Sequence, residues 1–474
     1  MNSPFLRIVA AMTGLALAAL GLWRAGLDCP IASAAPPATP PGPGKLTIYD
    51  SDPQHLWNRL HQALWVRTGP DGKEYGHDRL DPLLWMKTRH LLAGNSHEKA
   101  IAVLDEFLEK QGEKLVNDPL KQAILQRDLW AVFDWTTEPD ENSRGAHLER
   151  SPMLRRALQQ RMARIIQRLA LSAEQIKSLP DNYAAALASR AFAAKHDPNR
   201  PEQPFMPPDL FQKDGPWVEV EIDNGSAATA TRHVFDFGAR SAFRVFLRFP
   251  EGRAATIAYF AKLSDVPRPW MLTREPSRKK DTLVLNPDLP QFPVGTQAAL
   301  VRQMLLIDKA GGIAATRITE SVQLRVFRTV PKLMPERDRE RDAPPEQDFY
   351  EFTRSRAMLF AGKTGGLRPL GPNDKDFKTQ LLVLPTDEFE LHDNAPFERR
   401  MTQPTRSCLG CHDRPGIYAF PTYTGGTYPR GHNYLPDLQE NNSPDNQAQL
   451  SGMRKREQYS WGLLQGLWKD KPRK

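Results

Sequence analysis

The spacing of hydrophobic residues changes near Pro207-Pro208, and this change constrains the fold of the 474-residue chain more than any other feature. From about residue 50 to 195, apolar residues recur at the spacing of a helix face, for example behind the cap-and-proline pair Asp118-Pro119. Beyond residue 210, apolar and polar residues alternate as they do in strands. The clearest alternation falls at 218–222, 243–249 and 322–326. The sequence therefore predicts an α+β multidomain protein, with an N-terminal all-α domain over 50–205 and a central antiparallel β-sandwich-like domain over 206–330.

The chain beyond the alternating segments is less regular. Residues 331–347 are charged and contain several prolines, which indicates a linker or an exposed loop. The stretch 349–360 has a helix-like pattern, and LLVL at 381–384 resembles a strand. The remainder is rich in Pro, Gly, Asn and Tyr, so we expect a loop-rich C-terminal region over 348–474.

The N-terminus has the features of an export signal. Arg7 precedes an apolar run from Ile8 to Trp23, which is shorter than the ~20 residues that span a bilayer. Ala32-Ser33-Ala34 fits the A-x-A pattern of a cleavage site. We predict a signal peptide over 1–34 and a proline-rich linker over 35–49, with an uncleaved N-terminal membrane anchor as the alternative. Either way, the bulk of the protein is expected in the periplasm or another extracytoplasmic compartment.

One motif carries chemistry. Cys408-Leu409-Gly410-Cys411-His412 has the form C-x-x-C-H. Two thiols at this spacing on one turn can each add to a vinyl group of haem, and the adjacent histidine then falls under the iron. The motif resembles the haem-attachment sequence of c-type cytochromes, and the resemblance is limited to the C-terminal region. It implies one covalent haem c, with Cys408 and Cys411 as the thioether cysteines and His412 as the proximal iron ligand.

Three other roles of the cysteine pair stay open. A thioredoxin-like redox pair needs a βαβ context, which the sequence around residue 408 does not suggest. A zinc site needs further ligands, and His432 is the only later histidine. A plain Cys408–Cys411 disulfide in a non-haem scaffold is compatible with export.

The second axial ligand of the iron decides the function. Met453 could reach back to the motif and give an electron-transfer haem of raised potential, or it could be an ordinary core or surface residue. Met401 and His432 are weaker candidates. With no second protein ligand, the iron would have the open site of a haem enzyme or a gas-binding protein. We therefore expect an electron carrier first, and an oxidoreductase if the protein is enzymatic.

The charge of the chain indicates which kinds of partner it could bind. The net charge of +8 is spread along the chain, and no nucleic-acid partner is expected. The C-terminal stretch combines Arg454, Lys455 and Arg456 with Trp461 and Leu464. This pattern predicts a basic amphipathic helix that docks on a redox partner or a membrane surface, or one that packs on the haem region. Beside the motif, Arg414 is the candidate partner of a haem propionate. The sequence leaves the redox partner unidentified.

Overall fold

The computed structural model describes most of the chain between residues 47 and 469. The described residues are 47–68, 72, 74–76, 78, 96–137, 152–222, 228–266, 270–274, 281–286, 288–330, 346–371, 373–374, 376–377, 401–402, 408, 412, 414, 416–420, 438–443 and 445–469. The predicted signal peptide, most of the predicted linker over 331–347, and Cys411 and His432 lie outside them. Among the described helices, none is both long and apolar enough to cross a membrane.

The first described part of the chain is helical, as predicted. Its main helices are α2 (Leu56–Trp65), α3 (Ser96–Glu109), α4 (Pro119–Thr136), α5 (Pro152–Arg168), α6 (Ala173–Lys177) and α7 (Asn182–Ala188). Asp118 caps α4, because its carboxylate accepts hydrogen bonds from the backbone N–H groups of Leu120 and Lys121 at 2.8 and 3.2 Å. The apolar faces of α2, α3, α4 and α5 bury one another around Trp57 and Trp130. Two two-residue strands, β1 (Arg67–Thr68) and β2 (Glu74–Tyr75), pair beside them.

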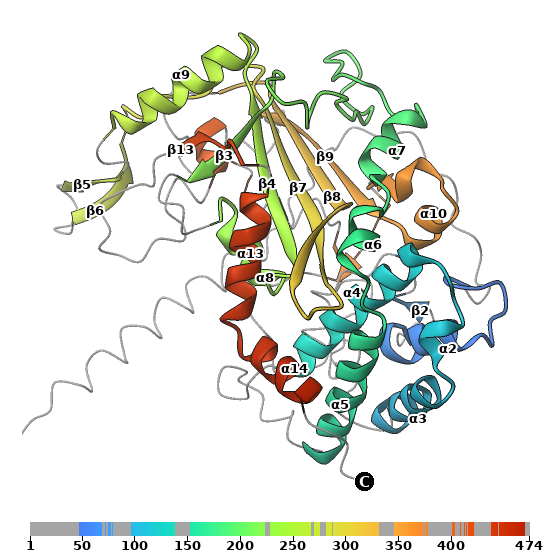
Figure 1. Cartoon of the computed structure of the whole chain (residues 1–474). Helices are drawn as coiled ribbons and strands as arrows, with labels where there is room; N and C mark the ends of the chain where they lie inside the picture. The colour runs from blue at the N-terminus through green and yellow to red at the C-terminus, as the bar shows by residue number, and fades with distance from the viewer. Residues whose placement is uncertain are drawn as a thin grey trace, which may run out of the picture.

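A seven-stranded antiparallel sheet forms the centre of the structure (Figure 1). Its strands are β3 (Val218–Ile222), β4 (Ser241–Arg248), β7 (Gln297–Ile307), β8 (Ile313–Phe327), β9 (Gln347–Arg354), β10 (Leu367–Pro369) and β13 (Leu438–Glu440). Their order in the sheet is β10-β9-β8-β7-β4-β3-β13. The strands predicted at 218–222, 243–249 and 322–326 are confirmed.

The two faces of the sheet are covered by helices and loops. One face carries Val322, Leu324 and Val326 of β8, which pack with the region of α7. The other face packs against α8 (Thr231–Asp236), α9 (Arg253–Ser264), η6 (Gly416–Ala419) and part of α13 (Asn446–Arg456). The remaining two-stranded pairs are β5 (Trp270–Arg274) with β6 (Asp281–Leu285), and β11 (Asp376–Phe377) with β12 (Met401–Thr402). Within the described ranges, one large sheet therefore stands where a two-sheet β-sandwich was expected, because helices and loops cover both of its faces.

The segment 349–360 was expected to start as a helix, and this expectation is wrong. It forms strand β9 up to Arg354 and only then the short helix α10 (Arg356–Phe360). Tyr350 and Phe352 alternate along β9 and bury on the same face as Val322 and Leu324 of β8. Pairing along the edge of β8 thus overrides the local helical pattern. As a result β9, β10 and β13, which fall inside the predicted C-terminal region, belong to the central sheet.

The C-terminal helix α14 (Tyr459–Lys469) packs on the N-terminal helices. Figure 1 shows it beside α5, and the rings of Trp461 and Trp130 lie 5.9 Å apart. The preceding basic run is only partly exposed, since Lys455 is fully buried and paired with Asp134. Burial lowers the pKa of Lys455 to about 8, although the Asp134 carboxylate opposes this shift. The described end of the chain therefore completes the N-terminal core.

Candidate functional site

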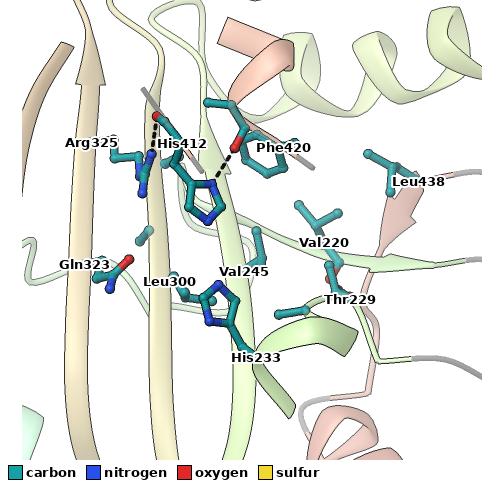
Figure 2. Close-up of a pocket in the computed structure, with 14 residues that line it drawn as sticks. Val220, Thr229, His233, Val245, Leu300, Gln323, Arg325, His412, Phe420 and Leu438 are labelled. Carbon is teal, nitrogen blue, oxygen red and sulfur yellow. Dashed lines mark hydrogen bonds between the residues drawn. The ribbon is translucent and has the colours of Figure 1, made fainter. Parts of the chain in front are cut away.

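A pocket opens between the central sheet and the two segments that carry His233 and His412 (Figure 2). The cavity itself has a volume of about 70 Å³, and one side of it is open to solvent. Its walls are mostly apolar and are built chiefly by Val220, Val245, Ala298, Leu300, Phe420 and Leu438. Gln323 and Arg325 of β8 and the two histidines are its main polar groups.

His412 is fixed in orientation by its own backbone neighbourhood. Its Nδ1 lies 2.6 Å from the carbonyl oxygen of Ala419, and since a carbonyl only accepts, Nδ1 carries the proton and donates it. The His412 carbonyl in turn accepts hydrogen bonds from Arg325 at 2.8 Å and from Gln347 at 2.7 Å. The lone pair of the imidazole is therefore on Nε2. A hydrogen bond from the far ring nitrogen is the usual support of a metal-binding histidine.

Cys408 does not line the pocket, but its thiol contacts Gln323, which does. Its backbone is helical, as is that of His412, and its Sγ is a free thiol 3.3 Å from Nε2 of Gln323 and 3.7 Å from a carboxylate oxygen of Glu351. Burial, together with the nearby Glu351 carboxylate, holds the pKa of this thiol well above its usual range. The thiol is thus kept protonated. The structure brings Cys408 and His412 together beside β8, whereas Cys411 is outside the described residues.

His233 faces His412 from the opposite side of the pocket. The two rings point toward one another in Figure 2, and their centroids are 5.9 Å apart with an angle of 6° between the ring planes. Burial lowers the pKa of His412 to about 3 and that of His233 to about 4, and the charge of Arg325 adds to both shifts. Both imidazoles are therefore neutral at neutral pH, which is the form that binds metals.

The other candidates from the sequence lie elsewhere. Met453 is 47% exposed on α13 and is not among the residues that line the pocket. Met401 is in the short strand β12, and its side chain is outside what the structure describes. Arg414 is half-buried and does not line the pocket, a position that Arg325 takes instead.

His233, Gln323 and Arg325 were missed by the sequence analysis. Gln323 and Arg325 alternate with the apolar residues of β8, and the usual interpretation of such positions is a solvated face. Both are in fact buried, at 9% and 7% exposure. Polar residues on the second face of a central strand were the available signal for a site there.

The residues of the pocket fit a covalently held haem. The free Nε2 of His412, the Cys408 thiol and an apolar cavity are compatible with a c-type haem, whose second attachment cysteine, Cys411, lies outside the described residues. No family model, curated protein or solved structure matches this chain. The chemistry of the site therefore rests on its own residues.

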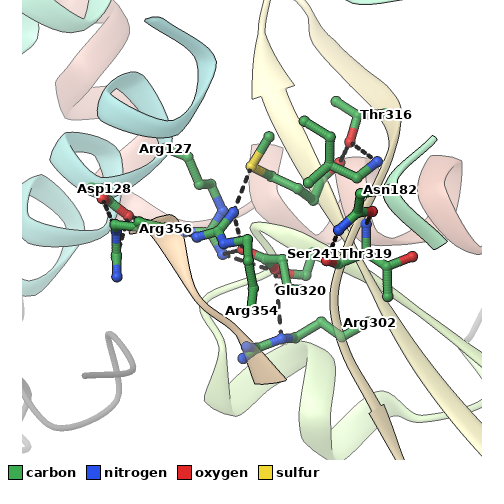
Figure 3. A network of polar contacts seen from close by, with 12 residues as sticks. Arg127, Asp128, Asn182, Ser241, Arg302, Thr316, Thr319, Glu320, Arg354 and Arg356 are labelled. Atoms are coloured by element: carbon green, nitrogen blue, oxygen red, sulfur yellow. Dashed lines mark hydrogen bonds and ion pairs between the residues drawn. The ribbon is translucent and has the colours of Figure 1, made fainter. Parts of the chain in front are cut away.

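A second cluster of polar side chains is buried where the N-terminal helices meet the sheet (Figure 3). Glu320 of β8 accepts a hydrogen bond from Ser241 at 2.5 Å and lies 3.4, 3.6 and 3.9 Å from Arg127, Arg302 and Arg354. Burial alone would raise the pKa of Glu320, but these three arginines outweigh it and lower the pKa to about 2.

The neighbouring carboxylates of this cluster are paired in the same way. Asp128 accepts two hydrogen bonds from Arg356 at 2.7 and 2.8 Å. Asp134 pairs with Arg240 and Lys455. The cluster joins α4 to β4, β7, β8 and β9, so its arrangement is that of a structural joint between helices and sheet.

Replacing Gly416 tests the turn that supplies the Ala419 carbonyl. Gly416 has a φ of 56°, and a Cβ there would meet the side-chain oxygen of Gln291, which already accepts the Ile417 N–H at 2.7 Å. We expect Gly416→Ala to lower the free energy of unfolding by about 1–3 kcal/mol, measured by urea denaturation. Gly462→Ala is the matched control: Gly462 lies within α14 with nothing near its Cβ position, so that substitution should raise stability by up to about 1 kcal/mol. Equal effects of the two substitutions would contradict a strained turn at Gly416.

Replacing Glu320 tests the joint between helices and sheet. Glu320→Gln removes the charge that three buried arginines share, and we expect a loss of about 3–5 kcal/mol in the free energy of unfolding. Glu106→Gln is the control, because Glu106 forms its ion pairs with Arg59 and Lys110 near the surface. That change should cost less than about 1 kcal/mol. A Glu320 variant as stable as the Glu106 variant would show that the joint is not needed for the fold.

Proposed function

We propose that this protein binds one haem c covalently and transfers electrons outside the cytoplasm. In this proposal Cys408 and Cys411 form the thioether bonds and His412 is the proximal iron ligand. The observation that supports it best is the orientation of His412. Its Nδ1–H donates a hydrogen bond to the carbonyl of Ala419, which leaves Nε2 available for a metal. Its ring lines an apolar pocket, and the Cys408 thiol contacts Gln323 of the same pocket. The C-x-x-C-H motif and the predicted export signal support the same proposal.

The residues around the pocket have separable roles. Ala419 fixes the ring of His412 and raises the basicity of its Nε2 through the hydrogen bond. Arg325 and Gln347 hold the backbone of the motif against β8 and β9. The apolar walls make the surroundings of a bound cofactor less polar, which would favour its less charged oxidation state. When bound, haem supplies a one-electron couple of its iron.

The lining of the pocket favours electron transfer over catalysis. The fourteen described residues that line it include no carboxylate and no hydroxyl group other than that of Thr229. Among them the titratable groups are two histidines and Arg325, and both histidines are neutral. Imidazoles with pKa values lowered this far are weak general bases, and an electron carrier needs no general acid or base.

Covalent attachment can be tested directly. The full-length chain, expressed with a cytochrome c maturation system, should gain the mass of one haem, show a c-type pyridine haemochrome spectrum and keep haem on a denaturing gel. The double substitution Cys408→Ala with Cys411→Ala should abolish all three signals, because both thioether bonds are lost. Cys29→Ala changes a cysteine outside the motif and should leave the haem content unchanged.

One result would overturn the proposal. It is a wild-type protein that is exported and folded under these conditions but has the unmodified mass and a Cys408–Cys411 disulfide. The site would then belong to a non-haem scaffold.

A further inference from the structure

The pocket holds a second histidine in the position where an axial ligand would be needed. Two imidazoles that share one metal ion, each with a metal–nitrogen bond of about 2 Å, have ring centres about 6 Å apart. The rings of His233 and His412 are 5.9 Å apart and almost parallel. Figure 2 shows the two imidazoles on opposite sides of the pocket. The spacing is thus that of two ligands to a single ion.

The fold holds His233 in this place. His233 is in α8, one turn of helix between β3 and β4, and the neighbouring Val234 is anchored in the core. The imidazole lies against the ring of Phe243 on β4, with centroids 5.4 Å apart and an angle of 26°. Packing on a central strand limits the rotation of the ring. An imidazole that is half-buried, neutral and lines a cavity is available as a ligand.

We propose that His233 is the second axial ligand of the haem iron, opposite His412. This inference rests on the proposed function, because it assumes a haem in the pocket. It replaces Met453, which lies exposed on α13 and away from the pocket. With imidazoles on both sides, the iron is six-coordinate and low-spin and has no open site for a gas or a substrate. Its potential is lower than that of a Met-ligated haem, because a thioether ligand raises the potential.

The test is spectroscopic and uses the full-length holoprotein made with a cytochrome c maturation system. The wild type should give the visible and electron paramagnetic resonance spectra of a low-spin ferric haem with two imidazoles, without the sulfur-to-iron charge-transfer band of Met ligation. His233→Ala should become high-spin, and added imidazole should restore the low-spin spectrum. Its reduced form should bind carbon monoxide more tightly than the wild type by about tenfold or more, because no internal ligand competes. His233→Met should raise the midpoint potential.

Two matched variants separate ligation from general damage. His196 is another buried histidine, which pairs with Asp348 at 3.0 Å and does not line the pocket, so His196→Gln should leave the haem spectrum unchanged. Met453→Leu should also leave it unchanged. If His233→Ala fails to retain haem, the wild-type spectra and the His233→Met potential decide the question without it.

The outcomes distinguish this inference from the proposed function. A wild type without covalent haem overturns the proposed function. A wild type with covalent haem that shows Met ligation, or a high-spin iron, overturns the role of His233 alone. So does a His233→Ala protein whose spectrum remains that of the wild type.

Discussion

The rest of the structure depends on β8, whose residues 318–327 are buried on both faces apart from the half-buried Ser321. The strand pairs with β7 on one side and β9 on the other, so a charged side chain in this part of it is costly unless it has a partner inside the protein. On one face of β8 the side chains are apolar, and Val322, Leu324 and Val326 pack into the core. On the other face Arg325 and Gln323 are used at the pocket, where they bond the His412 carbonyl and the Cys408 thiol. The site therefore depends on the polar side chains that alternate with apolar ones along β8.

Glu320, near the middle of the same strand, connects the sheet to the helices. A buried carboxylate is costly unless it is paired and hydrogen-bonded, and Glu320 is surrounded by Arg127, Arg302 and Arg354. These arginines come from α4, β7 and β9, so the carboxylate can be satisfied only when all three elements are in place. Such a cluster contributes little net stability compared with an apolar core, but it selects one arrangement of α4 against the sheet.

Local patterns in the sequence predicted the elements better than their assembly. The helix behind Asp118-Pro119 and the strands at 218–222 and 322–326 follow from capping and periodicity, which depend on near neighbours. The segment 349–360 was misjudged because its pairing with β8 depends on residues that are close in space. His233 gave no signal for a similar reason: α8 is a six-residue helix, too short for a periodic pattern, and its relation to His412 exists only through the sheet. Cys408 and His412 could be predicted as site residues because the C-x-x-C-H motif consists of contiguous residues.

The two proposed iron ligands, His412 and His233, come from segments that are far apart in the chain. A small electron carrier needs only about 100 residues, and it can place a motif and its second ligand on one short stretch. Here the motif lies after β9 and the facing imidazole lies between β3 and β4. To bring them 5.9 Å apart, the sheet must place β3, β4, β7, β8 and β9 in a fixed order, and that sheet must be buried on both faces. The helices α4, α6 and α7 pack against β7 or β8 of the sheet. Helix α14 shares a hydrophobic core with α4. In the proposed haem site, the helical part of the protein would supply the rigidity that two imidazoles from distant segments require.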